Sequence, residues 1–146
     1  MSNLDPRTPI LVGGAQFTQR TAREGKAAES LSPIAMMENV AKAAFADTGA
    51  GGKIASAFDT VAVVRFTADS PGEQGRLQKR MFRNPPLSLA NRLGAKPKRM
   101  FSPAVGSNTP QWLVNRTAEE VANGTCDVAL LHGAAYLASM LTAMKQ

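Results

Sequence analysis

Short apolar runs alternate with amphipathic stretches along this chain, and that alternation restricts the folds open to it. The clearest runs are 9–13, 60–64 and 127–133, with a weaker one at 99–103 that Pro103 confines to a sheet edge or a strand end. Runs this short and this apolar are typical of strands covered on both faces. The amphipathic stretches supply the crossover helices that parallel strands require. The sequence therefore predicts an α/β fold, a mixed and mostly parallel sheet with helices packed on it.

N-caps followed by proline, and glycines at the far end, bound three expected helices. These helices cover 33–48, 86–93 and 110–123, and Ser32 and Thr109 are the N-caps of the first and the third. The apolar stripes expected to face the core are Ile34, Met37, Val40, Ala41 and Ala44 in the first helix and Leu113, Val114, Thr117, Ala118 and Val121 in the third. Less regular patterns predict a loop over 17–31, a helical turn or two within 72–82 and a weak helix from 134 onwards.

Length and composition bound the class of protein. With 146 residues the chain has room for one compact domain and not for two. Its single cysteine, Cys126, excludes an internal disulfide framework and is typical of a reducing compartment. No apolar run has the length of a membrane span, and the first residues lack the pattern of a signal peptide. The sequence predicts a cytoplasmic protein without a membrane span, and one cysteine with one histidine is too few for a metal site.

The stretch 105–111, Val-Gly-Ser-Asn-Thr-Pro-Gln, is a glycine-containing turn that leads from an expected strand into an expected helix. Unpaired backbone N–H groups converge at helix N-termini, where α/β enzymes commonly place a nucleophile or bind an anion. The turn is therefore the candidate functional site.

Two other chemical interpretations of the sequence are weaker. Ser107 and the only histidine, His132, both lie near strand ends, which leaves a Ser–His hydrolase open, although the residues around Ser107 do not match a nucleophile elbow. The pair Gly13-Gly14 suggests a dinucleotide fold. A charged loop rather than a helix follows it, however, and Arg65 rather than an acid ends the second strand.

Five segments of the chain together match one family pattern in their order and spacing. They are TPILVGGAQ at 8–16, SP at 32–33, FDTVAVVR at 58–65, GSNTPQ at 106–111 and CDVALLHGA at 126–134. In these segments the chain resembles the N-terminal part of the thiolase superfamily, and within it the thiolase-like acetyl-CoA acetyltransferases akin to the sterol-carrier-protein-linked thiolases. The resemblance implies a partial thiolase-like N-terminal domain over residues 1–146, with the loop domain and the C-terminal thiolase domain absent.

The resemblance also implies an acyltransferase of lipid metabolism that takes a coenzyme A thioester as substrate and binds no cofactor. Ser107, 20 residues before Asp127, stands where the family has its nucleophilic cysteine, and Gly106 and Asn108 beside it are the implied substrate-binding residues. A serine hydroxyl is a far weaker nucleophile than a thiolate. The isolated chain is therefore expected to be inactive.

Association with another chain is expected for each of two functions. For the acyltransferase, the partner is a second copy of the chain, forming a homo-oligomer through Arg99 to Pro103 as the resemblance implies, or a chain that supplies the missing half. The alternative is a non-catalytic, thiolase-like interaction subunit that works only in complex with another chain; its motivation is the serine at the nucleophile position together with the missing half.

Basic residues concentrate in 71–100, where eight cations stand against Glu73 alone. They are Arg76, Lys79, Arg80, Arg83, Arg92, Lys96, Lys98 and Arg99. One interpretation, which suits the resemblance, assigns Arg80 and Arg83 to the phosphates of coenzyme A. The other is a solvated surface, or one neutralised by acidic partners. Nucleic acid is not expected, because the aromatic residues do not cluster with these charges.

Overall fold

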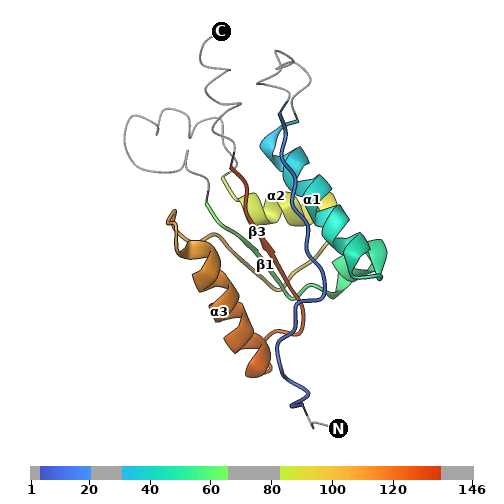
Figure 1. The fold of residues 1–146 in the computed structure, drawn as a ribbon, viewed down its shortest axis with the longest axis vertical. Helices are drawn as coiled ribbons and strands as arrows, with labels where there is room; N and C mark the ends of the chain where they lie inside the picture. Colours follow the sequence, from blue (N-terminus) through green and yellow to red (C-terminus); the bar gives the residue numbers. More distant parts are fainter. Residues whose placement is uncertain (1–3, 21–30, 66–82, 136–146) are drawn as a thin grey trace.

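A computed structural model describes residues 4–20, 31–65 and 83–135 of the chain. The elements in chain order are α1 (Pro33–Asp47), the 3-10 helix η2 (Gly51–Ala57), β1 (Thr60–Val63), α2 (Pro85–Leu93), β2 (Arg99–Phe101), α3 (Thr109–Ala122) and β3 (Ala129–His132) (Figure 1). The predicted helical turns within 72–82, and the part of the predicted C-terminal helix beyond 135, lie outside the described residues.

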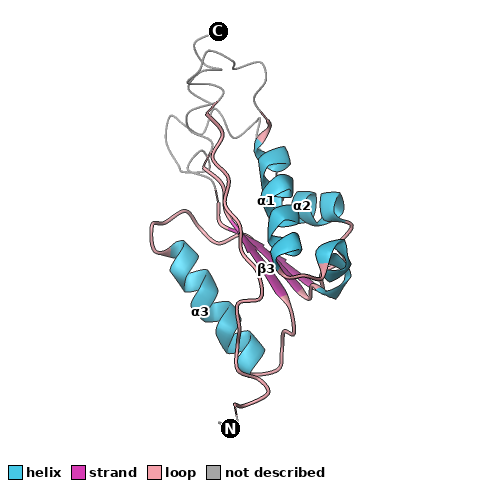
Figure 2. Ribbon diagram, turned by 45° about the vertical axis from the view of Figure 1, so that its right-hand side comes forward, coloured by secondary structure: helices cyan, strands magenta, loops and turns pink. Residues whose placement is uncertain are grey.

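The three strands form one sheet with β1 in the centre, in the order β2-β1-β3. Both pairings are parallel, with Thr60 opposite Arg99 on one side and opposite Ala129 on the other. The described sheet is thus wholly parallel. Helices α1 and α2 lie on one face of it and α3 on the other (Figure 2). The α/β class is confirmed: the crossover through α2 connects β1 to β2, and the crossover through α3 connects β2 to β3 on the other face of the sheet.

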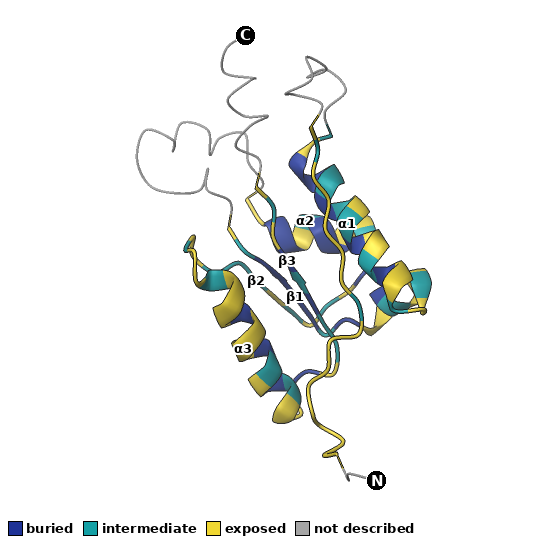
Figure 3. Ribbon diagram, in the orientation of Figure 1, coloured by how far each residue is buried: buried dark blue, intermediate teal, exposed yellow. Residues whose placement is uncertain are grey.

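The core lies between the central strand and the α1/α2 layer. All four residues of β1 are buried, and Val61 and Val63 pack with Met37 of α1, Leu89 of α2 and Leu130 of β3 (Figure 3). A strand can be buried along its whole length only if both of its faces are covered. The uninterrupted run that predicted β1 is therefore explained by its central position.

Local capping sets the helix bounds as the sequence predicts. The Ser32 hydroxyl accepts a hydrogen bond from the Ala35 amide at 3.3 Å, with Pro33 as the first residue of α1. Asn84 does the same for α2, accepting from the Leu87 amide at 3.1 Å. Gly94 ends α2 at a φ of 68°, in the left-handed region that glycine enters without strain. Both helices are confirmed within one residue of their predicted bounds.

The predicted strand at 9–13 is wrong. The described residues of this segment form no strand, and Ile10, Leu11 and Val12 are 77%, 91% and 51% exposed. The chain binds the end of α1 instead: the Gly14 amide donates to Asp47 at 2.9 Å, and a Cβ on Gly13 would lie 2.6 Å from the Ala44 carbonyl oxygen. An apolar run becomes a strand only when its backbone pairs with a sheet edge, and here the two glycines that follow the run contact the end of α1 while the run itself makes no such pairing.

Candidate functional site

The turn between β2 and α3 is held by hydrogen bonds at the carboxyl edge of the sheet. The Ser102 hydroxyl donates to the Val63 carbonyl at 2.7 Å, which fixes the end of β2 to β1. The Thr109 hydroxyl donates to the Ala104 carbonyl at 3.0 Å, and the Thr109 amide donates to the Gly106 carbonyl at 3.1 Å. These bonds close the turn on itself, so the start of α3 has a defined place relative to the strands.

Gly106 sits where a side chain would meet polar atoms. A Cβ at this position would lie 2.9 Å from the Thr109 hydroxyl oxygen and 3.1 Å from the Asn108 side-chain oxygen. The first of these distances is shorter than ordinary contacts of a carbon, so any other residue would displace the bonds that close the turn. The predicted glycine turn is confirmed as a tight structural feature.

The start of α3 differs from the prediction by one residue. Asn108 is the N-cap and Thr109 is the first helical residue, because the Thr109 hydroxyl is committed as a donor to Ala104 and does not accept from the helix. Pro110 has no N–H, and the Trp112 amide already donates to the Asn108 carbonyl at 3.0 Å. In the first turn of α3 only the Gln111 amide is left without an acceptor among the described residues. The turn therefore offers fewer open donors than a typical helix N-terminus.

Ser107 and Asn108 are both exposed at the tip of this turn. Exposure leaves the Ser107 hydroxyl accessible to a ligand, and α3 is 14 residues long, which gives its N-terminus the partial positive charge of a helix dipole. No basic side chain in the described ranges bonds to this hydroxyl. The start of α3 can therefore favour negative charge on a ligand beside Ser107, but no described side chain is placed to activate the serine.

The structure does not bring His132 to Ser107. In the register of the sheet His132 lies opposite Val63, a residue of the core under α1 and α2. Its Nε2 bonds the Met37 carbonyl of α1 at 3.0 Å. Helix α3 follows Ser107 on the other face of the sheet (Figure 2). The Ser–His hydrolase therefore has no support in the geometry.

The basic stretch is neutralised over much of its described length. Lys98 bonds Asp59 at 2.9 Å, Arg92 bonds Glu38 at 2.8 Å and Arg99 bonds Glu120 at 2.7 Å. The hydrogen bond from Lys98, followed by that from the Asp127 amide, lowers the pKa of Asp59 below its usual value. These pairs favour the interpretation of a surface matched by acidic partners. Arg83 is exposed just before α2, across the sheet from α3, and Arg80 lies outside the described residues.

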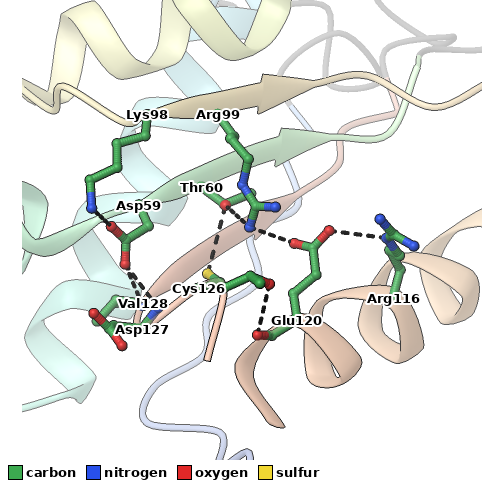
Figure 4. A network of polar contacts seen from close by, with 10 residues as sticks. Asp59, Thr60, Lys98, Arg99, Arg116, Glu120, Cys126, Asp127 and Val128 are labelled. Atoms are coloured by element: carbon green, nitrogen blue, oxygen red, sulfur yellow. Dashed lines mark hydrogen bonds and ion pairs between the residues drawn. The ribbon is translucent and has the colours of Figure 1, made fainter. Parts of the chain in front are cut away.

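A polar network at the amino ends of the strands joins α3 to the sheet (Figure 4). The Glu120 carboxylate accepts from Arg99 of β2 at 2.7 Å and from Arg116 at 3.0 Å, and Arg99 also donates to the Thr60 hydroxyl at 3.1 Å. Glu120 is only 8% exposed. The i, i+4 spacing of Arg116 and Glu120 is visible in the sequence, but the link to Arg99 is not, because it depends on how α3 lies on the sheet.

Cys126 lies in the same network and is not poised for chemistry. It is 2% exposed, and its Sγ lies 3.6 Å from the Thr60 hydroxyl oxygen. A buried thiol of this kind behaves as a small apolar residue. The described residues also contain no group of three or more acidic, histidine or cysteine side chains placed to hold a metal ion. None of the described helices is long and apolar enough to cross a membrane.

The sheet order places the candidate turn where α/β folds commonly bind ligands. In open parallel sheets ligands bind beyond the carboxyl ends of the strands, where crossovers leave in opposite directions. The order β2-β1-β3 has such a point beside β1, and the turn at 102–108 runs along that edge. The fold therefore supports the turn as the site, independently of the identity of residue 107.

Comparison with known proteins places the fold. No protein-family model matches the chain, and no curated protein matches it. Among solved structures it is similar to a monomeric SCP2-thiolase like protein type 1 from Mycobacterium smegmatis, with a TM-score of 0.68 and 32% sequence identity. The match covers 88% of this chain and 24% of that protein, so the chain spans about a quarter of its relative's length. Together with the order of its motifs, this identity shows that the chain belongs to the thiolase superfamily and, within it, to the SCP2-thiolase-like type.

Proposed function

We propose that this chain belongs to a thiolase-fold protein that handles acyl-CoA thioesters in lipid metabolism, and that the turn around Ser107 is its acyl site. The observation that carries the proposal is the exposed Gly106-Ser107-Asn108 turn, held at the carboxyl edge of a parallel sheet directly before α3. The chain spans about a quarter of its solved relative, so loop and C-terminal residues of a whole thiolase would come from elsewhere.

Ser107 acts in this proposal as electrostatic support more than as nucleophile. The Gln111 amide and the dipole of α3 favour negative charge at the turn, which suits the oxygen of an acyl carbonyl during attack. A serine without a base stays protonated and transfers no acyl group at a useful rate. The isolated chain would bind an acyl-CoA without turning it over.

Replacing Ser107 with cysteine is expected to create an acylation site. The thiolate of S107C would attack the thioester carbonyl of acetyl-CoA, forming a new thioester on the protein and releasing the coenzyme A thiol. Helix N-termini lower the pKa of such thiols, which raises the thiolate fraction. Intact-mass and peptide mapping by mass spectrometry would show one acetyl group at position 107 in S107C and none in the wild type or in S107A.

Cys126 is the internal reference for that measurement. It is 2% exposed and should remain unmodified under conditions that acylate position 107. If S107C stays unacylated even when the thiolase segments that this chain does not span are supplied, the turn is not an acyl site.

Reversing the charge of Arg80 and Arg83 tests whether these arginines bind the phosphates of coenzyme A. If Arg80 and Arg83 bind them, replacing both with glutamate should weaken acyl-CoA binding in isothermal titration calorimetry by at least about ten-fold, the equivalent of 1.4 kcal/mol. Lys53→Glu is the control, because Lys53 lies in η2, which precedes the amino end of β1, whereas the Ser107 turn follows the carboxyl end of β2. Equal affinities in the double variant and the wild type would remove these arginines from the site.

The second candidate is a non-catalytic interaction subunit, and the limited set of open donors at the turn favours it. In the first turn of α3, Pro110 lacks an N–H, and the bonds of Thr109 and Trp112 leave only the Gln111 amide without an acceptor among the described residues. A stable complex with a second chain, together with no acyl-CoA binding by calorimetry, would support this function.

Self-association through β2 is part of either proposal, whereas the solved relative is described as monomeric. A monomer in size-exclusion chromatography would contradict it.

A further inference from the structure

His132 joins the edge strand β3 to the middle of α1. Its Nε2 lies 3.0 Å from the Met37 carbonyl oxygen, and Met37 itself is completely buried in the core. The imidazole is 9% exposed, and its Nδ1 has no hydrogen-bond partner among the described residues. With Nε2–H donating to Met37, the Nδ1 lone pair faces the protein interior without a donor. The link is thus a single hydrogen bond made by a ring in its neutral form.

Protonation would place a second N–H on that ring, at Nδ1, which makes no hydrogen bond to the described residues, and the Gly133 backbone, which favours the protonated ring, offsets the cost only in part. A buried, unpaired donor costs free energy, and a buried charge costs more. Burial accordingly lowers the pKa of His132 from its ordinary value of 6.5, against the smaller opposing effects of the Met37 and Gly133 backbone. The folded protein therefore holds the ring neutral, and the unfolded chain takes up the proton first as the pH falls.

Charged side chains on the neighbouring elements do not offset this cost. They are Glu38, Lys42 and Asp47 of α1, Arg92 of α2 and Arg65 just beyond β1. Glu38 is bonded to both Lys42 and Arg92, at 2.6 and 2.8 Å, and Asp47 accepts from the Gly14 amide at the far end of α1. Arg65 is exposed and carries the same sign as a protonated imidazole. A positive charge on His132 would have no free carboxylate in the described surroundings.

We propose that His132 is a pH-sensitive latch: it joins α1 to the edge strand β3 while its ring is neutral, and protonation separates α1 from β3 because the buried positive charge is stabilised only when water reaches the ring. The latch lies at the carboxyl end of β3, the same edge of the sheet that carries the turn at Ser107. It does not depend on the proposed acyl site, since it acts through the packing of α1 on the opposite face.

The sign of the effect follows from linkage. Because the folded state binds its proton more weakly, stability is complete above pH 6.5 and falls as the pH drops towards the lower pKa of the folded state. The uptake of one proton lowers the folding equilibrium constant by up to about ten-fold for each pH unit in that window.

The test uses the full 146-residue chain, whose only histidine gives a single imidazole C2–H signal in proton NMR. The latch predicts a midpoint for this signal below 6.5 in the folded protein. It also predicts that amide hydrogen exchange, corrected for intrinsic rates, accelerates in α1 more than in α3 between pH 7 and pH 5. A midpoint at or above 6.5 would overturn the proposal without any variant.

His132→Gln separates the latch from general acid sensitivity. The glutamine amide can still donate to the Met37 carbonyl but does not titrate, so the fall in stability between pH 6.5 and pH 5 should disappear. Glu38→Gln is the control: the hydrogen bonds of Lys42 and Arg92 lower the pKa of Glu38 below 4.5. This variant should therefore lose a constant amount of stability between pH 7 and pH 5 and keep the wild-type slope there, with the slope changing only below pH 4.5. Equal pH profiles for His132→Gln and the wild type would contradict the latch.

Discussion

Replacing Leu89 with alanine is expected to lower the free energy of unfolding by about 2–5 kcal/mol. Leu89 lies on α2, is completely buried and packs in the cluster that joins α1, α2 and β1. Truncation removes its contacts and leaves a cavity that a close-packed core fills only in part. A loss of this size approaches the whole stability of many small domains. Urea denaturation followed by far-UV circular dichroism would measure it.

Leu87→Ala is the matched control for that experiment. Leu87 stands on the same helix and loses the same atoms, but it is 41% exposed. Its truncation should change the unfolding free energy by no more than about 0.5–1 kcal/mol. If both variants lose the same amount, the core assignment of α2 is wrong and its buried face has been misplaced.

The helices that the sequence predicted well are those whose ends are decided locally. Ser32 caps α1 and Asn84 caps α2 through hydrogen bonds within three residues, and Gly94 supplies the left-handed residue that α2 needs. Such signals depend on a few neighbours in the chain and survive any tertiary arrangement. For the same reason β1 was predictable, since its unbroken apolar run matches burial on both faces.

The predictions that were wrong concern segments whose structure depends on contacts with residues distant in the sequence. The run Ile10 to Val12 has the composition of a strand, but its neighbours Gly13 and Gly14 bind α1, and nothing local reveals which partner it takes. On α3, Val114 was expected in the core and is 50% exposed, whereas Glu120 was not expected there and is 8% exposed. Hydrophobic periodicity treats a carboxylate as a surface residue, whereas Arg99 on β2, together with Arg116, makes the burial of Glu120 favourable.

The candidate site also combines features that depend on local sequence with features that depend on tertiary contacts. Its place between a strand and a helix was predictable from the order of elements, and Gly106 fits the tight turn that the structure shows. Its donor set was not predictable, because it depends on the bond from Thr109 to Ala104 that shifts the cap to Asn108. The pairing of Lys98 and Arg99 with carboxylates likewise follows from sheet register, and the basic stretch alone gave no indication of it.

Replacing Glu120 with alanine is expected to destabilise the chain by about 2–3 kcal/mol, since it removes a buried carboxylate that accepts charged hydrogen bonds from two arginines and leaves those arginines uncompensated. Two arginines, Arg99 and Arg116, converge on its carboxylate at 2.7 and 3.0 Å, and without it they repel one another. Their side chains are 40% and 53% exposed, so water reaches them and keeps the loss below that of a fully buried pair. The measurement is again urea denaturation, with Glu119→Ala as the exposed neighbour that should cost little.

A double-mutant cycle with Arg99→Met distinguishes the pairing of Arg99 with Glu120 from a simple loss of packing. If Arg99 and Glu120 hold α3 to β2 as a unit, removing both should cost less than the two single losses added together, by about 0.5–3 kcal/mol. Additive losses would mean that Glu120 stabilises the chain through contacts within α3, such as that with Arg116, and not through Arg99. The cycle also bears on the candidate site: β2 and α3 meet at the Ser107 turn, and Arg99 with Glu120 joins the same two elements at the other edge of the sheet. A real coupling would therefore mean that the position of the turn is fixed in part by a contact at the far end of α3.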